Sequence, residues 1–322
     1  MLIESVPNVS EGRRLDVVDR LAETITAGAG VYLLDRTSDA SHNRSVFTIA
    51  GEHGPVSDAL ERLVEAAVHE IDMDVHTGEH PRIGAVDVIP FVPLGSTTMD
   101  DCVELARAFG ERIATRFDLP VFLYAKAASR AERVKLADVR RGGYEGLKRE
   151  IAESGREPDF GPSRLHPSAG AVAVGARPFL IAYNINLDSR DVELAKRIAR
   201  RVRESGGGLP KVQANGFWIE ELGRAQVSMN ILDFEVTPLW VVWETVREVA
   251  AEDGVELAES ELIGLAPLAA LLAVADRADA PPDAPVEQRL EAAAQFLRLR
   301  DFSPMQALEL RLEDARSTGR IR

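Results

Sequence analysis

The chain has 322 residues, of which 45% are hydrophobic, and its formal net charge at pH 7 is −14. This length predicts one large domain or two of ordinary size, and the acidic balance argues against broad binding to nucleic acids or anionic membranes. No stretch reaches the roughly 18 consecutive apolar residues of a membrane helix, and the first residues lack the pattern of a signal peptide. The single cysteine, Cys102, excludes an internal disulfide framework. We therefore expect a cytoplasmic protein with no membrane or nucleic-acid partner.

Hydrophobic periodicity predicts that strands and helices alternate in the first half of the chain. The expected strands are 2–7, 31–34, 45–50, 85–92, 121–125 and 171–174. The expected helices are 15–25, about 55–71, about 98–117 and, in part, 130–149. A loop rich in proline and glycine, 158–170, leads into the last of these strands.

The second half repeats this order of elements. Its expected elements are a strand 179–185 that ends in the polar segment 184–186, a helix 191–204, a strand from 211 to 213 or a little further, a strand 225–231, a helix 238–251 capped by Thr237, a strand within 257–265, a helix 267–275 and a helical tail 286–316. The shared order is strand, helix, strand, strand, helix, strand, helix, which is typical of a split βαβ unit.

A sheet with helices on one face leaves its other face uncovered, and two such sheets can cover each other. We therefore predict an α+β fold, an α/β sandwich of two subdomains, 1–177 and 178–322. Each subdomain should be a mixed β-sheet with helices on the outer face, and the two sheets should face each other around a ligand tunnel.

The segment 76–82, HTGEHPR, is the main candidate for chemistry. Pro81 excludes a helix, so the i, i+4 spacing of His76 and His80 loses the meaning it has in helical zinc sites. Either histidine alone is explained as a hydrogen-bonded structural residue. His80 lies closer to the following apolar strand, which carries Asp87, and a histidine held by a carboxylate exchanges protons near neutral pH. The chain has no P-loop, no GxSxG elbow and no CxxC motif, so nucleotide binding and covalent catalysis are not indicated.

Other polar side chains are expected at the ends or edges of strands, where asparagine is disfavoured. They are Asn8, Asn43, Arg44, Asn184, Asn186 and Asn230. Two interpretations remain open for them: solvated turns and backbone caps, or groups that face a ligand in the cleft. The arginine run 130–141 is typical of a solvated face and alternatively of a site for a polyanion.

Seven segments together resemble the glutamate formiminotransferase family. They are VPNVSEG (6–12), HNRSVFTIAG (42–51), HTGEHPRIGAVDVIPFVP (76–93), PVFLYAKAA (120–128), RRGGYEGL (140–147), PDFGPSRLHPSAGAVAVGARPFLIAYNINL (158–187) and AQVSMNILDFEVTP (225–238). The resemblance covers most of residues 2–275, and we expect the monofunctional form without a cyclodeaminase domain. The chain departs from the family pattern at Thr37, where relatives carry an aspartate, and at His166, where they carry an apolar residue.

The resemblance implies two sheets around a folate tunnel and transfer of a formimino group between N-formimino-L-glutamate and tetrahydrofolate, in histidine degradation. It places the catalytic general acid/base on His80, and it implies a homodimer that needs no metal. The implied folate-binding residues are Gly161, Pro162, Ser163, Arg164, Leu165, His166, Pro167, Ser168, Ala169 and Gly170. The expected substrate-binding residues are Asn8, Asn43, Arg44, Arg82, Asp87, Asn184, Asn186 and Asn230. The alternatives are a glutamate N-formyltransferase that uses 5-formyltetrahydrofolate and a non-catalytic folate-binding module.

Overall fold

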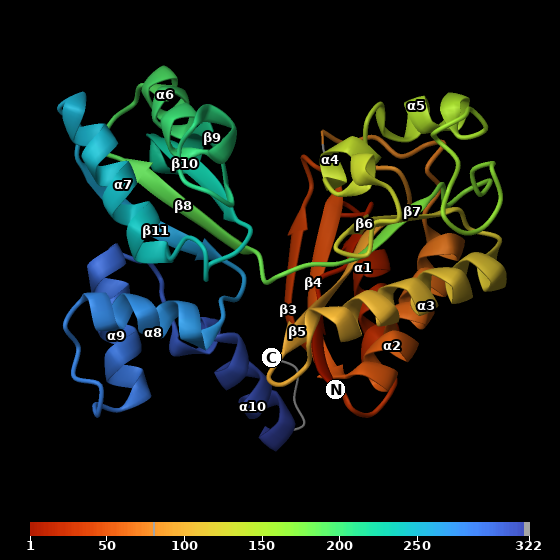
Figure 1. Ribbon diagram of the computed structural model, residues 1–322, viewed down its shortest axis with the longest axis horizontal. Helices are drawn as coiled ribbons and strands as arrows, with labels where there is room; N and C mark the ends of the chain where they lie inside the picture. The colour runs from red at the N-terminus through yellow and green to blue at the C-terminus, as the bar shows by residue number, and fades with distance from the viewer. Residues whose placement is uncertain (80, 319–322) are drawn as a thin grey trace. The chain divides into compact units, whose positions relative to one another are not determined.

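The computed structural model of the chain describes residues 1–79 and 81–318 (Figure 1). It divides into two compact units, Met1–Pro178 and Phe179–Thr318, which we call unit 1 and unit 2. Each unit has its own β-sheet together with helices. The predicted α+β class with two subdomains is therefore confirmed, whereas the tunnel between facing sheets stays a prediction.

Unit 1 is built on a seven-stranded sheet. Its strands are β1 Leu2–Ser5, β2 Asn8–Val9, β3 Val31–Asp39, β4 Arg44–Glu52, β5 Val86–Leu94, β6 Val121–Ala125 and β7 Val172–Ala176. β1 and β2 are consecutive pieces of one extended segment, and both lie between β4 and β5, antiparallel to each. β3 pairs with β4, while β7 joins β5 and β6 in parallel. The sheet thus has an antiparallel half and a parallel half.

Successive residues of a strand point to opposite faces of the sheet, and the two faces of unit 1 are covered differently. Ile89 belongs to a large core with α1 Leu15–Thr26, α2 His53–Glu70 and α3 Met99–Phe117. Val88 belongs to a smaller core on the other face. That second core lies under α4 Leu136–Val139 and α5 Gly143–Glu150 and covers the parallel half of the sheet (Figure 1).

The amino end of α3 shows how local sequence sets an element. Thr98 is its N-cap, and its side chain accepts a hydrogen bond from the backbone N–H of Asp101. The Asp101 carboxylate in turn accepts from the Thr98 backbone, which completes a capping box. The predicted start of this helix is confirmed.

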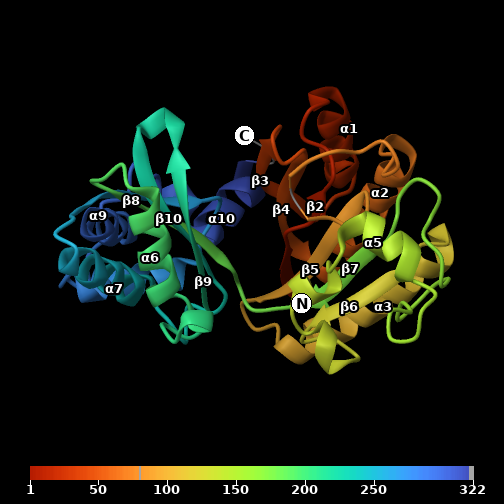
Figure 2. The same ribbon diagram turned by 90° about the horizontal axis from the view of Figure 1, so that it is seen from above.

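Unit 2 has a four-stranded sheet with helices (Figure 2). Its strand order repeats that of the antiparallel half of unit 1. Its elements are β8 Ile181–Leu187, α6 Val192–Val202, β9 Val212–Ile219, β10 Arg224–Ile231, α7 Leu239–Glu252, β11 Leu257–Ile263, α8 Leu268–Arg277, α9 Val286–Leu297 and α10 Leu308–Thr318. The sheet order is β11, β8, β10, β9, with every pair antiparallel. In unit 1, β5, β1 with β2, β4 and β3 occupy the same order, so the shared order of elements corresponds to a shared sheet topology.

Three local expectations were wrong. β3 continues through polar residues to Asp39, because its backbone stays paired with β4. β8 continues through its asparagines to Leu187 for the same reason, with β10 and β11 as partners. Thr237 does not cap α7: Pro238 is the N-cap, and the Thr237 hydroxyl donates to the carbonyl of Pro210 at 2.6 Å.

Candidate active site

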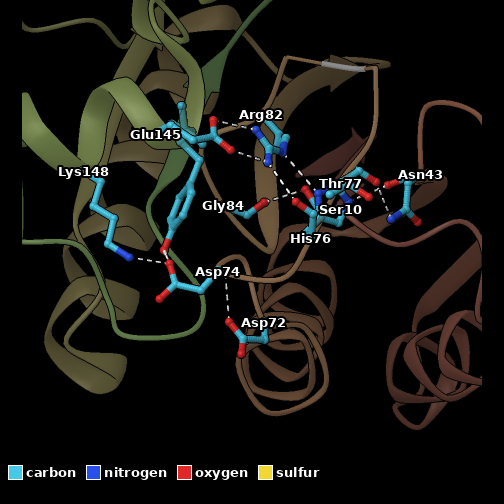
Figure 3. Close-up of polar contacts among 12 residues, drawn as sticks. Ser10, Asn43, Asp72, Asp74, His76, Thr77, Arg82, Gly84, Glu145 and Lys148 are labelled. Carbon is cyan, nitrogen blue, oxygen red and sulfur yellow. Dashed lines mark hydrogen bonds and ion pairs between the residues drawn. The ribbon is translucent and has the colours of Figure 1, made fainter.

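The loop HTGEHPR leads into β5, and two of its side chains hold each other. Arg82 is 9% exposed and donates from Nε to His76 Nδ1 at 3.1 Å and from Nη2 to the His76 carbonyl at 3.0 Å. Its guanidinium also binds the Glu145 carboxylate of α5 through two hydrogen bonds of 3.0 and 2.8 Å (Figure 3). Arg82 therefore ties the loop to the helix that covers the sheet. His80, the predicted catalytic residue, lies outside the described residues.

His76 is held as a neutral imidazole. Nδ1 accepts a hydrogen bond from Arg82, so the ring proton is on Nε2, which donates to the carbonyl of Asn43 at 3.0 Å. Burial lowers the pKa of His76 below 6.5, and the charge of Arg82 lowers it further. Both ring nitrogens are engaged within the protein, so His76 acts as a strut of the loop.

Asn43 joins the segment that follows β2 to the loop 76–82. Its Oδ1 accepts from the backbone N–H of Gly12 at 3.0 Å. Its Nδ2 donates to the carbonyl of Thr77 at 2.9 Å (Figure 3). The residue is 7% exposed and has φ = 49°, a left-handed conformation that asparagine tolerates better than most residues. The amide of Asn43 thus fixes the backbone at Gly12 against the loop 76–82.

A β-bulge places Asp87. Asn8 pairs with Val88 whereas Val9 pairs with Val86, so Asp87 is an extra residue in β5. The bulge interrupts the alternation of the strand and turns Asp87 to the face of Val88 and Asn8. This is the face opposite α1, α2 and α3.

The Asp87 carboxylate is 2% exposed and fully engaged. One oxygen accepts the backbone N–H of Ile83 at 2.8 Å, and the other accepts a hydrogen bond from Arg140, which follows α4. Burial raises the pKa of Asp87, although the charge of Arg140 opposes the shift. The expected contact of Asp87 with His80 stays a prediction, because His80 is not among the described residues.

Arg44 opens β4 on the same face and is mostly buried. Among the described residues it has no ion pair within 4.0 Å and no side-chain hydrogen bond. Burial lowers the pKa of Arg44, and the nearby charge of Arg140 lowers it further. The arginine run is therefore not a simple solvated face: the side chain of Arg140 is 15% exposed, and that of Arg133, paired with Asp159, is 5% exposed.

Close backbone contact joins the predicted folate segment 161–170 to the start of β5. Gly84 and Gly170 form an isolated bridge. A Cβ at Gly84 would lie 1.8 Å from the carbonyl oxygen of Ala171, and Gly170 has φ = 71° with a Cβ position 2.5 Å from the Ile83 oxygen. Only glycine fits this crossing without a backbone shift.

His166 organises the turn at the end of this segment. Its Nδ1 accepts from the backbone N–H of Ala169 at 3.1 Å and of Ser168 at 3.3 Å. Burial lowers the pKa of His166, in keeping with a ring nitrogen that accepts. An apolar residue could not make these bonds. Thr37, the other departure from the family pattern, is an exposed residue of β3 opposite Val46.

Unit 2 carries a polar network on one face of its sheet. Alternation places three expected residues on that face: Asn184, Asn186 and Asn230. Asn184 donates to Glu261 at 3.0 Å, and Gln226 donates to Asn186 at 2.9 Å and to Glu261 at 3.1 Å. Asn186 also donates to Glu259 at 3.3 Å, whereas Asn230 is exposed.

The structure thus gathers the expected residues into two sets, one per unit. Unit 1 brings together the loops 8–12, 76–82 and 161–170 with Arg44 and Asp87. Sequence reasoning missed Glu145, Arg140 as the partner of Asp87, and the unit 2 residues Gln226, Glu259 and Glu261. The polar residues at alternate positions of β10 and β11 were a signal for the last three. Within residues 1–79 and 81–318, no three His, Cys, Asp or Glu side chains gather as a metal-ligand set.

Comparison with known proteins gives matches along most of the chain. The sequence model described as formiminotransferase domain, N-terminal subdomain, matches residues 2–177, and the formiminotransferase domain model matches residues 182–307. The glutamate formimidoyltransferase of Thermoplasma acidophilum is 46% identical over 316 residues, which cover 98% of this chain and 98% of the relative. That of Streptococcus pyogenes serotype M1 is 46% identical over 275 residues, covering 85% and 92%. The formimidoyltransferase-cyclodeaminase of Rattus norvegicus is 46% identical over 277 residues, covering 84% of this chain and 51% of the relative.

Proposed function

Because the chain belongs to the formiminotransferase family, we propose that it transfers a formimino group between N-formimino-L-glutamate and tetrahydrofolate. In this reaction the bond between the glutamate nitrogen and the formimino carbon breaks, and a bond from a nitrogen of tetrahydrofolate to that carbon forms. One proton leaves the attacking nitrogen and one reaches the leaving nitrogen. The match to both family domains and to full-length relatives with this activity in their names carries the proposal.

We assign the proton transfers to His80. An imidazole can remove and return a proton near pH 7, a contribution typically worth about 10²- to 10⁴-fold in rate. The other histidine of the loop, His76, is engaged at both ring nitrogens and has a lowered pKa, which leaves it no free position for this role. The hydrogen bonds of His76 and Asn43 support this assignment indirectly, because they hold residues 76 and 77, which precede His80 in the sequence.

The remaining expected residues take two kinds of role in this proposal. The segment 161–170 binds folate, and Asn8, Arg44, Asn184, Asn186 and Asn230 contact the substrates. Asn43, Arg82 and Asp87 act as positioning residues, since their polar atoms are engaged with protein groups. The proposed substrates, N-formimino-L-glutamate and tetrahydrofolate, are small anionic molecules. Among the described residues, no helix is long and apolar enough to cross a membrane.

Steady-state turnover with each of two donors tests the proposal. Tetrahydrofolate with N-formimino-L-glutamate should give rapid transfer, and 5-formyltetrahydrofolate with glutamate should give little. A clear preference for the formyl group would instead identify a glutamate N-formyltransferase. Tight folate binding with no transfer from either donor would identify a binding module. We also propose a homodimer, which a monomeric mass at micromolar concentration would refute.

A further inference from the structure

The face of unit 1 that carries Asp87 also holds two mostly buried arginines, Arg44 and Arg140. Arg140 is fixed there by its ion pair with Asp87, whose side chain is 2% exposed. Asp87 is itself held by the backbone N–H of Ile83 at 2.8 Å. Arg44 adds a second guanidinium, which forms no ion pair within 4.0 Å with the described residues, although the charges of Asp39 and Asp87 act on it. A mostly buried guanidinium that makes no hydrogen bond to the described residues is costly, so Arg44 calls for an acceptor.

Two buried atoms on this face also lack partners. Arg140 Nε and Asn8 Oδ1 are buried and form no hydrogen bond with the described residues. Nearly all buried polar atoms in folded proteins are hydrogen-bonded, so such atoms call for an explanation. Rotation of the Asn8 amide by 180° would place its NH₂ donors at the same position. A ligand with acceptor oxygens would then satisfy both residues.

The sheet register brings these groups onto neighbouring strands. Asn8 of β2 pairs with Val46 of β4 and with Val88 of β5. Arg44 lies two residues before Val46, so it shares that face, and Asp87 reaches the face through its bulge. A guanidinium from β4, an amide from β2 and the Arg140 guanidinium held from β5 thus converge beside the loop 76–82, to which Asn43 ties the start of β4.

The geometry points to a carboxylate-binding site formed by Arg44 and Arg140, with Asn8 beside them and Asp87 as the residue that positions Arg140. A carboxylate has the acceptor oxygens and the planar shape that guanidinium groups bind through paired hydrogen bonds. The identity of the ligand rests on the proposed function: the carboxylate is that of a glutamyl group. Both N-formimino-L-glutamate and the glutamate tail of folate carry one.

Calorimetric titration of an Arg44→Met variant tests this site, because methionine keeps an apolar stem and removes the charge. The probes are N-formyl-L-glutamate, which resembles the donor, and tetrahydrofolate against tetrahydropteroate, which lacks the glutamyl group. We expect a loss of affinity of at least about 10-fold for one glutamyl ligand, in the range of a charged hydrogen bond. A loss for N-formyl-L-glutamate assigns the site to the donor. A loss for tetrahydrofolate, with tetrahydropteroate unchanged, assigns it to the folate tail.

The matched control is Arg36→Met, which removes an arginine of β3 that pairs on the surface with Asp19 at 2.5 Å and should leave every affinity unchanged. A ligand-side test needs no folded variant: wild-type protein should bind N-formyl-L-glutamate more tightly than its α- or γ-amide. If the folded Arg44→Met variant binds all glutamyl ligands as the wild type does, the site is refuted. If the wild type binds these ligands but shows no turnover, the proposed function is refuted and the site stands. If the wild type shows turnover but Arg44→Met binds glutamyl ligands with unchanged affinity, the site is refuted and the proposed function stands.

Discussion

Replacement of Asn43 by alanine should remove the hydrogen bonds that connect Gly12 and Thr77 through its amide. The variant loses the bonds to Gly12 N–H at 3.0 Å and to the Thr77 carbonyl at 2.9 Å, each worth about 1 kcal/mol. Alanine must also adopt φ near 49°, which costs roughly 1–2 kcal/mol for a residue with a Cβ and no local side-chain bond. The sum predicts a loss of about 3 kcal/mol in the free energy of unfolding, a large part of the 5–15 kcal/mol typical of a domain.

Urea unfolding followed by far-UV circular dichroism measures this loss. The three tryptophans, Trp218, Trp240 and Trp243, all belong to unit 2. Their fluorescence therefore follows the unfolding of unit 2 and serves as an internal reference, because the substitution lies in unit 1. An Asn43→Gly variant loses the same two bonds without the backbone strain and should be about 1 kcal/mol more stable than Asn43→Ala. A loss below about 1 kcal/mol in Asn43→Ala, with the glycine variant no better, would show that the amide does not fix the loops.

Four further outcomes are expected. His80→Gln should lower kcat at least about 100-fold and change the folate Kd only a few-fold. The kcat of His76→Gln should stay within about 10-fold of wild type, because glutamine can still accept from Arg82 and donate to the Asn43 carbonyl. The opposite ranking of the two variants would show that the assignment of catalysis to His80 is wrong. Because the pKa of His76 is lowered in the folded state, the unfolded state takes up the His76 proton at a higher pH than the folded state does. The free energy of unfolding should therefore fall as the pH drops below 6.5. This fall should be smaller in His76→Gln when unfolding is measured at each pH. Gly84→Ala should cost at least about 2 kcal/mol by the same unfolding assay, because its Cβ would meet a backbone oxygen at 1.8 Å; wild-type stability would mean that the crossing has room. Burial raises the pKa of Cys102 to about 11, so iodoacetamide at pH 8 should label this thiol in urea and leave it unlabelled in the native protein, as mass spectrometry would record.

Periodicity and capping were enough to predict the elements whose residues carry a local signal. The run of β5, apolar except for Asp87, the capping pair Thr98 and Asp101 of α3, and the strand 121–125 were all identified. The polar ends of β3 and β8 were not, because their strand conformation depends on hydrogen bonds to β4 and β10 rather than on their own residue types. Pairing between distant strands overrides local preference in such segments.

The candidate site divides in the same way. The loop 76–82 and Asp87 stood out as residue types in an unusual context. Their partners did not, since Glu145 lies 63 positions from Arg82 and Arg140 lies 53 positions from Asp87. The bulge that turns Asp87 depends on one extra residue against β2, which a single sequence does not reveal. The role of His80 stays a prediction.

The position of the segment formed by β1 and β2 has a consequence for how unit 1 folds. These residues precede all others in the sheet, yet they lie between β4 and β5, which end at residues 52 and 94. The central strand therefore has no complete set of partners until the chain has been synthesised past β5, and contacts between residues so far apart slow folding because the loop must close first. Ile3 and Val9 are buried in the folded protein. During synthesis, these apolar residues remain exposed to solvent until β4 and β5 have been made. We expect nascent chains stalled on the ribosome before residue 94 to be sensitive to protease throughout unit 1. In nascent chains that extend past β7, all of unit 1 should become resistant to protease at once.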